Sequence, residues 1–193
     1  AALVLAASGA ALPILIRPAG AHAGNDLAKI DNRDQVAGYL ADVAADEFYV
    51  TDFVDYSNGD SHYRKYRFIY IGGVPYPFHL AVSKRWMVHY YNADMDSAWK
   101  RDEECRFLAD YTQRFDASLQ RALETIGKAV GLDYFGIDCS ITADNRLLLF
   151  EVDVGMIVHL MDPIATHPCK HRYVPRIFQA LERLIDARIA GMA

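Results

Sequence analysis

The chain has 193 residues, of which 52% are hydrophobic and 23% are charged, and 20 Lys and Arg stand against 25 Asp and Glu, a net charge of −5. These values are ordinary for a folded domain and exclude intrinsic disorder, and three cysteines exclude a disulfide-dense scaffold. The negative charge argues against a general affinity for nucleic acid or an anionic membrane. A chain of this length can fold without disulfides or a structural metal, as one compact domain or two small lobes.

The start of the chain, residues 1–16, is almost wholly apolar. Ala21-His22-Ala23 looks like a signal-peptidase site, but the segment has no basic leader and is shorter than the ~20 residues that cross a bilayer. We therefore expect no membrane segment. Because the first residue is Ala rather than Met, it stays open whether the chain begins where the natural protein does.

The next part of the chain predicts short strands around one helix. Residues 12–16 read as a buried strand that runs into a loop with two glycines, residues 17–25. Asn32 is a suitable N-cap for a helix, because apolar residues follow at helical spacing, at Val36, Tyr39, Leu40 and Val43. Further strands, separated by turn sequences, are predicted over residues 48–54, 63–71 and 78–82. We expect these three strands to form one small antiparallel sheet.

The rest of the chain predicts two helices and a hairpin. Residues 92–104 read as a polar connection, and Asp116 can cap a helix that stops at Gly131. Two strands follow over residues 134–141 and 146–152, and a closing amphipathic helix starts near Tyr173. The predicted fold class is α+β with a mainly antiparallel sheet.

Three carboxylates lie in this predicted hairpin. If Asp144-Asn145 forms a two-residue turn, Asp138 faces Glu151 across the strands. Strand alternation then places Asp153 on the same face, and the other face is covered by apolar residues, among them Leu148, Phe150 and Val152. Opposed carboxylates repel each other unless they are protonated or share a cation. Asp138, Glu151 and Asp153 are therefore candidate ligands of Mg²⁺ or Mn²⁺, with a plain solvated acidic face as the alternative.

Cationic residues elsewhere are candidates for binding phosphate beside such a metal. Arg17 ends the first strand just before the two-glycine loop, where backbone N–H groups can approach phosphate oxygens. Lys65 and Arg67 share one face of a predicted strand. A simple turn and a solvated basic edge are the alternative readings of these two features.

Taken together, these segments resemble the ATP-grasp superfamily, nearest to its amino-acid and peptide ligases. Residues 132–138 followed by 149–153 are similar to the family's metal-binding strands, in which an Asp and a Glu-x-Asn unit hold magnesium. Asp153 stands here in place of that Asn. Residues 65–72 resemble the strand whose Arg contacts the reacting phosphate, a role that falls to Arg67.

The resemblance extends to the nucleotide-binding elements. Residues 14–24 look like the family's cationic strand and glycine loop, with Arg17 in place of the usual Lys. Residues 48–54 look like the segment that holds adenine, although the family commonly has Gln-Glu where Thr51-Asp52 stands. The resemblance therefore implies one catalytic residue, Arg67, and a set of cofactor-binding residues: Arg17, Gly20, His22, Gly24, Thr51, Asp52, Phe53 and Lys65.

The resemblance also implies an architecture and a reaction. Two small lobes with antiparallel sheets and flanking helices, residues 12–82 and 83–193, are expected around a nucleotide cleft. The implied enzyme uses ATP and Mg²⁺ to activate a small carboxylate or peptide as an acylphosphate, which an amine attacks. The resemblance does not include the family's usual N-terminal domain. The sequence is therefore compatible with a fragment, with a minimal enzyme, or with a chain whose site is completed by a second copy or another partner. A non-catalytic, regulatory ATP-binding module is the main alternative.

The cysteines and histidines bear on a further alternative. Cys105, Cys139 and Cys169 are odd in number and widely spaced, which favours free thiols in a reducing compartment and a cytoplasmic location. A zinc site is a less favoured alternative, with His167, Cys169, His171 and, as a fourth ligand, His159. The spacing of these residues matches no closed zinc framework.

Overall fold

The computed structural model describes residues 9–22 and 24–191, and the chain divides into two compact units, Ala1–Asp55 and Tyr56–Ala193. The lobe boundary expected from the sequence, between residues 82 and 83, lies within the second of these units. Part of the apolar start (residues 1–8) and Ala23 of the signal-like triplet lie outside the described residues. Among the helices that the structure describes, none has the length and apolar content of a membrane span.

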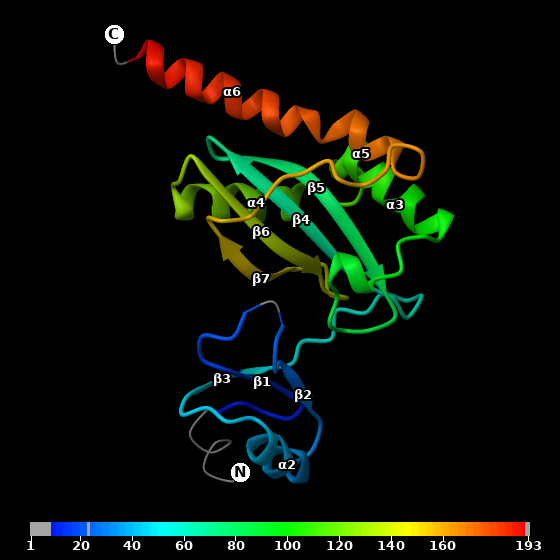
Figure 1. Ribbon diagram of the computed structural model, residues 1–193, viewed down its shortest axis with the longest axis vertical. Helices are drawn as coiled ribbons and strands as arrows, with labels where there is room; N and C mark the ends of the chain where they lie inside the picture. Colours follow the sequence, from blue (N-terminus) through cyan, green and yellow to red (C-terminus); the bar gives the residue numbers. More distant parts are fainter. Residues whose placement is uncertain (1–8, 23, 192–193) are drawn as a thin grey trace. The chain divides into compact units, whose positions relative to one another are not determined.

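The first unit is a three-stranded antiparallel sheet packed on one helix (Figure 1). Its strands lie in the order β2 (Ala28–Ile30), β1 (Ile14–Pro18) and β3 (Phe48–Asp52), and the helix is α2 (Arg33–Asp42). Asn32 caps α2 as predicted, and its side chain accepts hydrogen bonds from the N–H groups of Asp34 and Gln35. The small core consists of Ile14, Ile16, Ile30 and Val36.

The second unit is built on a four-stranded antiparallel sheet in the order β5 (Val74–Ser83), β4 (Tyr63–Ile71), β6 (Tyr134–Ile141) and β7 (Leu147–Asp153). The bounds predicted for β4 and β6 agree with the structure. The expected sheet of residues 48–54, 63–71 and 78–82 is wrong, because β3 pairs with β1 whereas β4 pairs with both β5 and β6. The α+β class and the two antiparallel sheets are confirmed.

Helices cover both faces of this sheet (Figure 1). On one face, Tyr66, Phe68 and Tyr70 of β4 pack in a core with residues of α3 (Ala98–Ala109) and α4 (Ala117–Val130). On the other face, Ile69 and Ile71 pack against α6 (Pro175–Ala190), which follows the short α5 (Pro168–Tyr173). Odd and even residues of one strand point to opposite faces, so β4 serves two cores.

Helix α3 replaces much of the polar connection expected over residues 92–104. The sequence conceals this helix because its buried side includes Lys100 and Glu104. The carboxylate of Glu104 accepts hydrogen bonds from the Tyr90 hydroxyl at 3.0 Å and the Leu80 N–H at 3.3 Å, and lies 3.7 Å from Nζ of Lys170. Burial raises the pKa of Glu104 to about 7, against the opposing charge of Lys170. A buried polar network therefore holds this helix together with the apolar contacts of Phe107 and Leu108.

A disulfide joins α3 to α5 and corrects the expectation of free thiols. Cys105 and Cys169 are bonded with their Cα atoms 5.4 Å apart, whereas Cys139 is a free, buried thiol. The two bonded residues are 64 positions apart in sequence. They meet because α3 and α5 pack together, which spacing alone does not reveal.

Candidate functional site

A row of polar side chains crosses all four strands of the larger sheet. Arg67 in β4 is paired with His79 in β5 and with Asp138 in β6, and Asp138 is paired with Glu151 in β7. Residues paired directly across strands lie on the same face. Lys65, two positions before Arg67, joins this face. The predicted opposition of Asp138 and Glu151 is therefore confirmed.

The carboxylate of Asp138, with 2% of its side chain exposed, is held by two cations. Lys65 donates from Nζ to Oδ2 at 2.8 Å, and Arg67 donates from Nε to Oδ1 at 2.6 Å and from Nη2 to Oδ2 at 2.8 Å. Burial raises the pKa of Asp138, but the hydrogen bonds and positive charges of Arg67 and Lys65 outweigh it, so this pKa lies well below its ordinary value. Asp138 is thus ionised at neutral pH and holds both cations in place.

Glu151 and Asp153 leave carboxylate oxygens open beside this cluster. The side chain of Glu151 is 55% exposed, and its Oε1 lies 3.9 Å from Nη2 of Arg67. Burial and the charge of Asp138 raise the pKa of Glu151. Asp153 accepts a hydrogen bond from the N–H of Gly155 at 2.7 Å and adds its negative charge to the surroundings of Arg67 and Glu151. This surplus of negative charge favours a cation.

The oxygen donors of Glu151 and Asp153 suit a hard divalent cation such as Mg²⁺. Asp138 is less available than the sequence suggests, because both of its oxygens are bonded to Lys65 and Arg67. Within residues 9–22 and 24–191, no three His, Cys, Asp or Glu side chains converge on one point as a metal cluster. Glu151 and Asp153 are therefore the carboxylates that remain free to hold a cation, with water or phosphate as its other ligands.

His79 extends the row on the other side of Arg67. Burial, and then the positive charge of Arg67, hold the pKa of His79 well below its ordinary value, so its imidazole is neutral. Its Nε2 is buried with no hydrogen-bond partner among the described residues. The sequence does not select His79, because counting back from the Gly72-Gly73 turn places Phe78 opposite Arg67. A bulge in β5 shifts this pairing by one residue.

The predicted phosphate loop lies in the first unit, after β1. Arg17 donates to the carbonyl oxygen of Ala21, and its guanidinium carbon lies 4.9 Å from the centre of the Tyr49 ring. The Arg17 side chain is therefore hydrogen-bonded within the loop that follows β1. Gly20 and Gly24 adopt φ angles of 82° and 76°, which glycine reaches without strain, and His22 is exposed.

The predicted adenine segment lies at the other end of this small sheet. Thr51 pairs with Leu15 and Asp52 with Ile14, so both lie near the start of β1, whereas Arg17 lies near its end. Phe53 donates its N–H to the carbonyl oxygen of Pro13 at 2.9 Å. Within the first unit, the structure does not bring the segment 51–53 together with the loop that carries Arg17, Gly20, His22 and Gly24.

Two further readings of the sequence, both of the second unit, are corrected by the structure. Cys169 is consumed by the disulfide, so the zinc site with His159, His167 and His171 loses its only sulfur ligand. Only part of the apolar side of β7, an edge strand, covers a core: Leu148 packs against it, whereas Phe150 is 39% and Val152 42% exposed.

Comparison with known proteins gives fold-level neighbours only. No protein-family model and no curated protein matches the chain. Among solved structures, D-alanine–D-alanine ligase from Bacillus anthracis complexed with ATP is 10% identical with a TM-score of 0.49, and the match covers 93% of this chain and 53% of that one. A RimK domain ATP-grasp protein from Sphaerobacter thermophilus is 13% identical with a TM-score of 0.45, and the match covers 86% and 52%.

Biotin carboxylase from Campylobacter jejuni is 9% identical with a TM-score of 0.48, and the match covers 89% of this chain and 37% of that one. In structure, the chain is similar to ATP-grasp ligases. It spans between about a third and a half of the length of these proteins. Each TM-score is below 0.5, so this similarity carries no conclusion about function.

Proposed function

We propose that this chain binds ATP with Mg²⁺ and activates a carboxylate as an acylphosphate, which an amine or a similar nucleophile then attacks. The observation that carries the proposal is the cross-strand row, which places Lys65 and Arg67 beside three carboxylates on one face. Phosphoryl transfer depends mainly on positioning and on neutralising charge, and it requires no covalent nucleophile from the protein.

In this proposal the residues of the row have distinct roles. Glu151 and Asp153 hold the divalent cation, which when bound neutralises phosphate charge. Asp138 fixes the guanidinium of Arg67, whose fork suits a phosphate group, and Lys65 adds a second cation. The ionised Asp138 thus acts as a positioning residue, a role that differs from the metal ligand that the sequence suggests.

In this proposal the residues of the first unit bind the nucleotide. The N–H groups around Gly20 and Gly24, with Arg17 and His22, contact phosphates, and the segment 51–53 contacts adenine. The substrate is a small carboxylate or a peptide, whose site a further domain or a second copy completes. The cytoplasmic location also stays a prediction, and the disulfide counts against it, because such bonds are typical of oxidising compartments.

The test is ATP turnover by the purified chain, measured as ADP release with panels of amino acids and amines, with Mg²⁺ and with EDTA. Glu151→Gln is expected to lower turnover at least a hundredfold with an unchanged circular dichroism spectrum, whereas Glu124→Gln, an exposed carboxylate on α4, leaves it unchanged. Equal Mg²⁺-dependent turnover by Glu151→Gln and the unmodified chain would refute the role of Glu151.

A second candidate function is a nucleotide-binding module without catalysis. The observation that favours it is the complete pairing of Asp138 by Lys65 and Arg67, which leaves two carboxylates rather than three for a metal. Calorimetric titration with ATP, set beside the turnover assay, separates the two. Saturable ATP binding with no ADP release under any condition would favour the module.

A further inference from the structure

The turn that leads into β4 contains the only Asn-Gly pair in the sequence, Asn58-Gly59. The backbone nitrogen that follows an asparagine can attack the side-chain carbon Cγ, because this attack closes a five-membered ring. A glycine has no Cβ to hinder the approach. The other asparagines, at positions 25, 32, 92 and 145, precede residues that carry a side chain. The sequence therefore offers one place where this ring closure is least hindered.

The turn fixes the backbone of Asn58 and leaves Gly59 open. Asn58 donates its N–H to the carbonyl oxygen of His62 at 2.9 Å, and its own carbonyl oxygen accepts from the N–H of Ser61 at 2.8 Å. Gly59 is exposed, and its N–H has no hydrogen-bond partner in the part of the chain that the structure describes. A Cβ built at Gly59 would meet nothing within 4 Å. The attacking nitrogen is therefore neither hydrogen-bonded within the described chain nor crowded.

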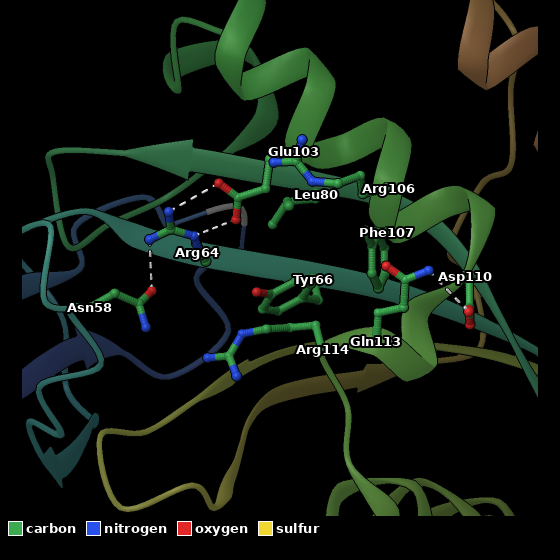
Figure 2. A pocket seen from close by; sticks show the side chains of 10 residues that line it. All are labelled: Asn58, Arg64, Tyr66, Leu80, Glu103, Arg106, Phe107, Asp110, Gln113 and Arg114. Carbon is green, nitrogen blue, oxygen red and sulfur yellow. Dashed lines mark hydrogen bonds and ion pairs between the residues drawn. The ribbon is translucent and has the colours of Figure 1, made fainter.

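The side-chain oxygen of Asn58 is held by a fixed guanidinium group (Figure 2). Nη1 of Arg64 donates to Oδ1 of Asn58 at 2.9 Å. The same guanidinium donates to Asp60 from Nη1 at 3.0 Å and from Nη2 at 2.8 Å, and to Glu103 from Nε at 2.5 Å and from Nη2 at 3.0 Å. These bonds engage all five of its N–H groups, and the side chain is only 12% exposed. Arg64 is thus a preorganised donor to the amide of Asn58.

This donor lies where negative charge develops during ring closure. When the Gly59 nitrogen adds to Cγ of Asn58 and loses its proton, Oδ1 becomes an oxyanion. A fixed cationic donor at that oxygen stabilises the transition state more than the ground state. The contact between Arg64 and Asn58 therefore favours the reaction that the Asn-Gly pair permits.

We propose that Asn58 is a site of spontaneous deamidation and that Arg64 accelerates it. The Gly59 nitrogen bonds to Cγ, its proton passes to water, and the Cγ–Nδ2 bond breaks to release ammonia. Water then opens the succinimide at either carbonyl carbon, which leaves aspartate or isoaspartate at position 58. One water is consumed for each ammonia released. The inference does not depend on the proposed function, because Arg64 and Lys65 point to opposite faces of β4.

The product changes the surroundings of Arg64. Its new carboxylate adds to those of Asp60 and Glu103, so one guanidinium faces three carboxylates in place of two. Isoaspartate also adds a methylene to the backbone of a turn that the bridge between Ser57 and Tyr63 closes. The modification therefore alters both the charge and the backbone at the start of β4.

Peptide mapping by mass spectrometry, with aspartate and isoaspartate separated by chromatography, tests the proposal on the purified chain during incubation at mildly alkaline pH. Asn58 is expected to convert while Asn145, which is exposed and precedes Arg146, stays intact. The reference is a synthetic peptide of residues 55–62, which lacks Arg64. One charge-assisted hydrogen bond is expected to make the folded chain about tenfold faster than this peptide. No conversion of Asn58, or conversion no faster than in the peptide, would overturn the proposal.

Matched variants separate the role of Arg64 from that of Gly59. Arg64→Gln is expected to slow the conversion about tenfold, whereas Glu103→Gln removes another partner of Arg64 and is expected to leave the rate within about twofold. Gly59→Ala, for which the turn has room, is expected to leave Asn58 intact over the same incubation. An unchanged or faster rate in Arg64→Gln with an unchanged circular dichroism spectrum would refute the acceleration, and an unchanged rate in Gly59→Ala would refute the attacking nitrogen.

Discussion

Replacing Asp138 by Asn tests whether this carboxylate anchors two cations. The substitution keeps the shape of the side chain, removes its charge and replaces one acceptor oxygen by an NH2 donor. Lys65 and Arg67, whose side chains are 10% and 21% exposed, then lose the carboxylate to which they are joined at 2.8 and 2.6 Å. The next carboxylate, Glu151, lies 3.9 Å from Arg67.

The expected cost follows from this geometry. Breaking a buried ion pair by removing one partner costs about 3–5 kcal/mol. Because Arg67 keeps some solvent and the nearby Glu151, we expect Asp138→Asn to lower the free energy of unfolding by about 3 kcal/mol. Glu151→Gln removes a charge that is 55% exposed and is expected to cost at most about 1 kcal/mol.

Urea unfolding followed by circular dichroism at pH 7 measures both values. The pH dependence adds a second check on Asp138. Its pKa is depressed in the folded state, so its contribution is complete above about pH 4 and is lost as the pH falls further. Asp138→Asn should remove this acid-induced loss. A cost below about 1 kcal/mol, or equal costs for the Asp138 and Glu151 variants, would contradict the anchoring role.

Three further predictions concern the rest of the second unit. Folding raises the pKa of Glu104 from an ordinary value of 4.5 to about 7, so the free energy of unfolding should fall by roughly 3 kcal/mol between pH 4.5 and 8. Glu104→Gln should flatten this dependence in urea unfolding measured across that pH range. Reducing the bond between Cys105 and Cys169, which closes a 64-residue separation, should cost about 4 kcal/mol in the same assay, and no effect of a reductant would refute the pairing. Gly127→Ala should destabilise the fold by about 1–3 kcal/mol, because the new Cβ would lie 2.8 Å from the carbonyl oxygen of Gly73. Alanine usually favours a helix, so a rise in the thermal midpoint of unfolding would contradict this contact.

Local signals account for the elements that the sequence predicts correctly. Asp116 caps α4 through the N–H groups of Ser118 and Leu119, and Gly131 ends it in the left-handed conformation. Asn32 marks the start of α2 in the same way. These features depend on hydrogen bonds within a few residues, and the sequence contains them directly.

Long-range packing explains what the sequence misses. Helix α3 turns Glu104 inward, and its partners lie in distant parts of the chain, among them the Leu80 N–H and Lys170. The disulfide depends on the same packing.

The sequence predicts the opposition of Asp138 and Glu151 from a two-residue turn that does not form. The hairpin closes with Thr142 donating its N–H to the carbonyl oxygen of Arg146, a three-residue loop in which Asn145 has a φ of 58°. That register alone would place Phe150 opposite Asp138. The extra residue of a bulge restores the expected pairing. Without this bulge an aromatic ring would replace Glu151 on the face of Arg67 and Lys65, so the charges of this face favour the bulged register over the regular one.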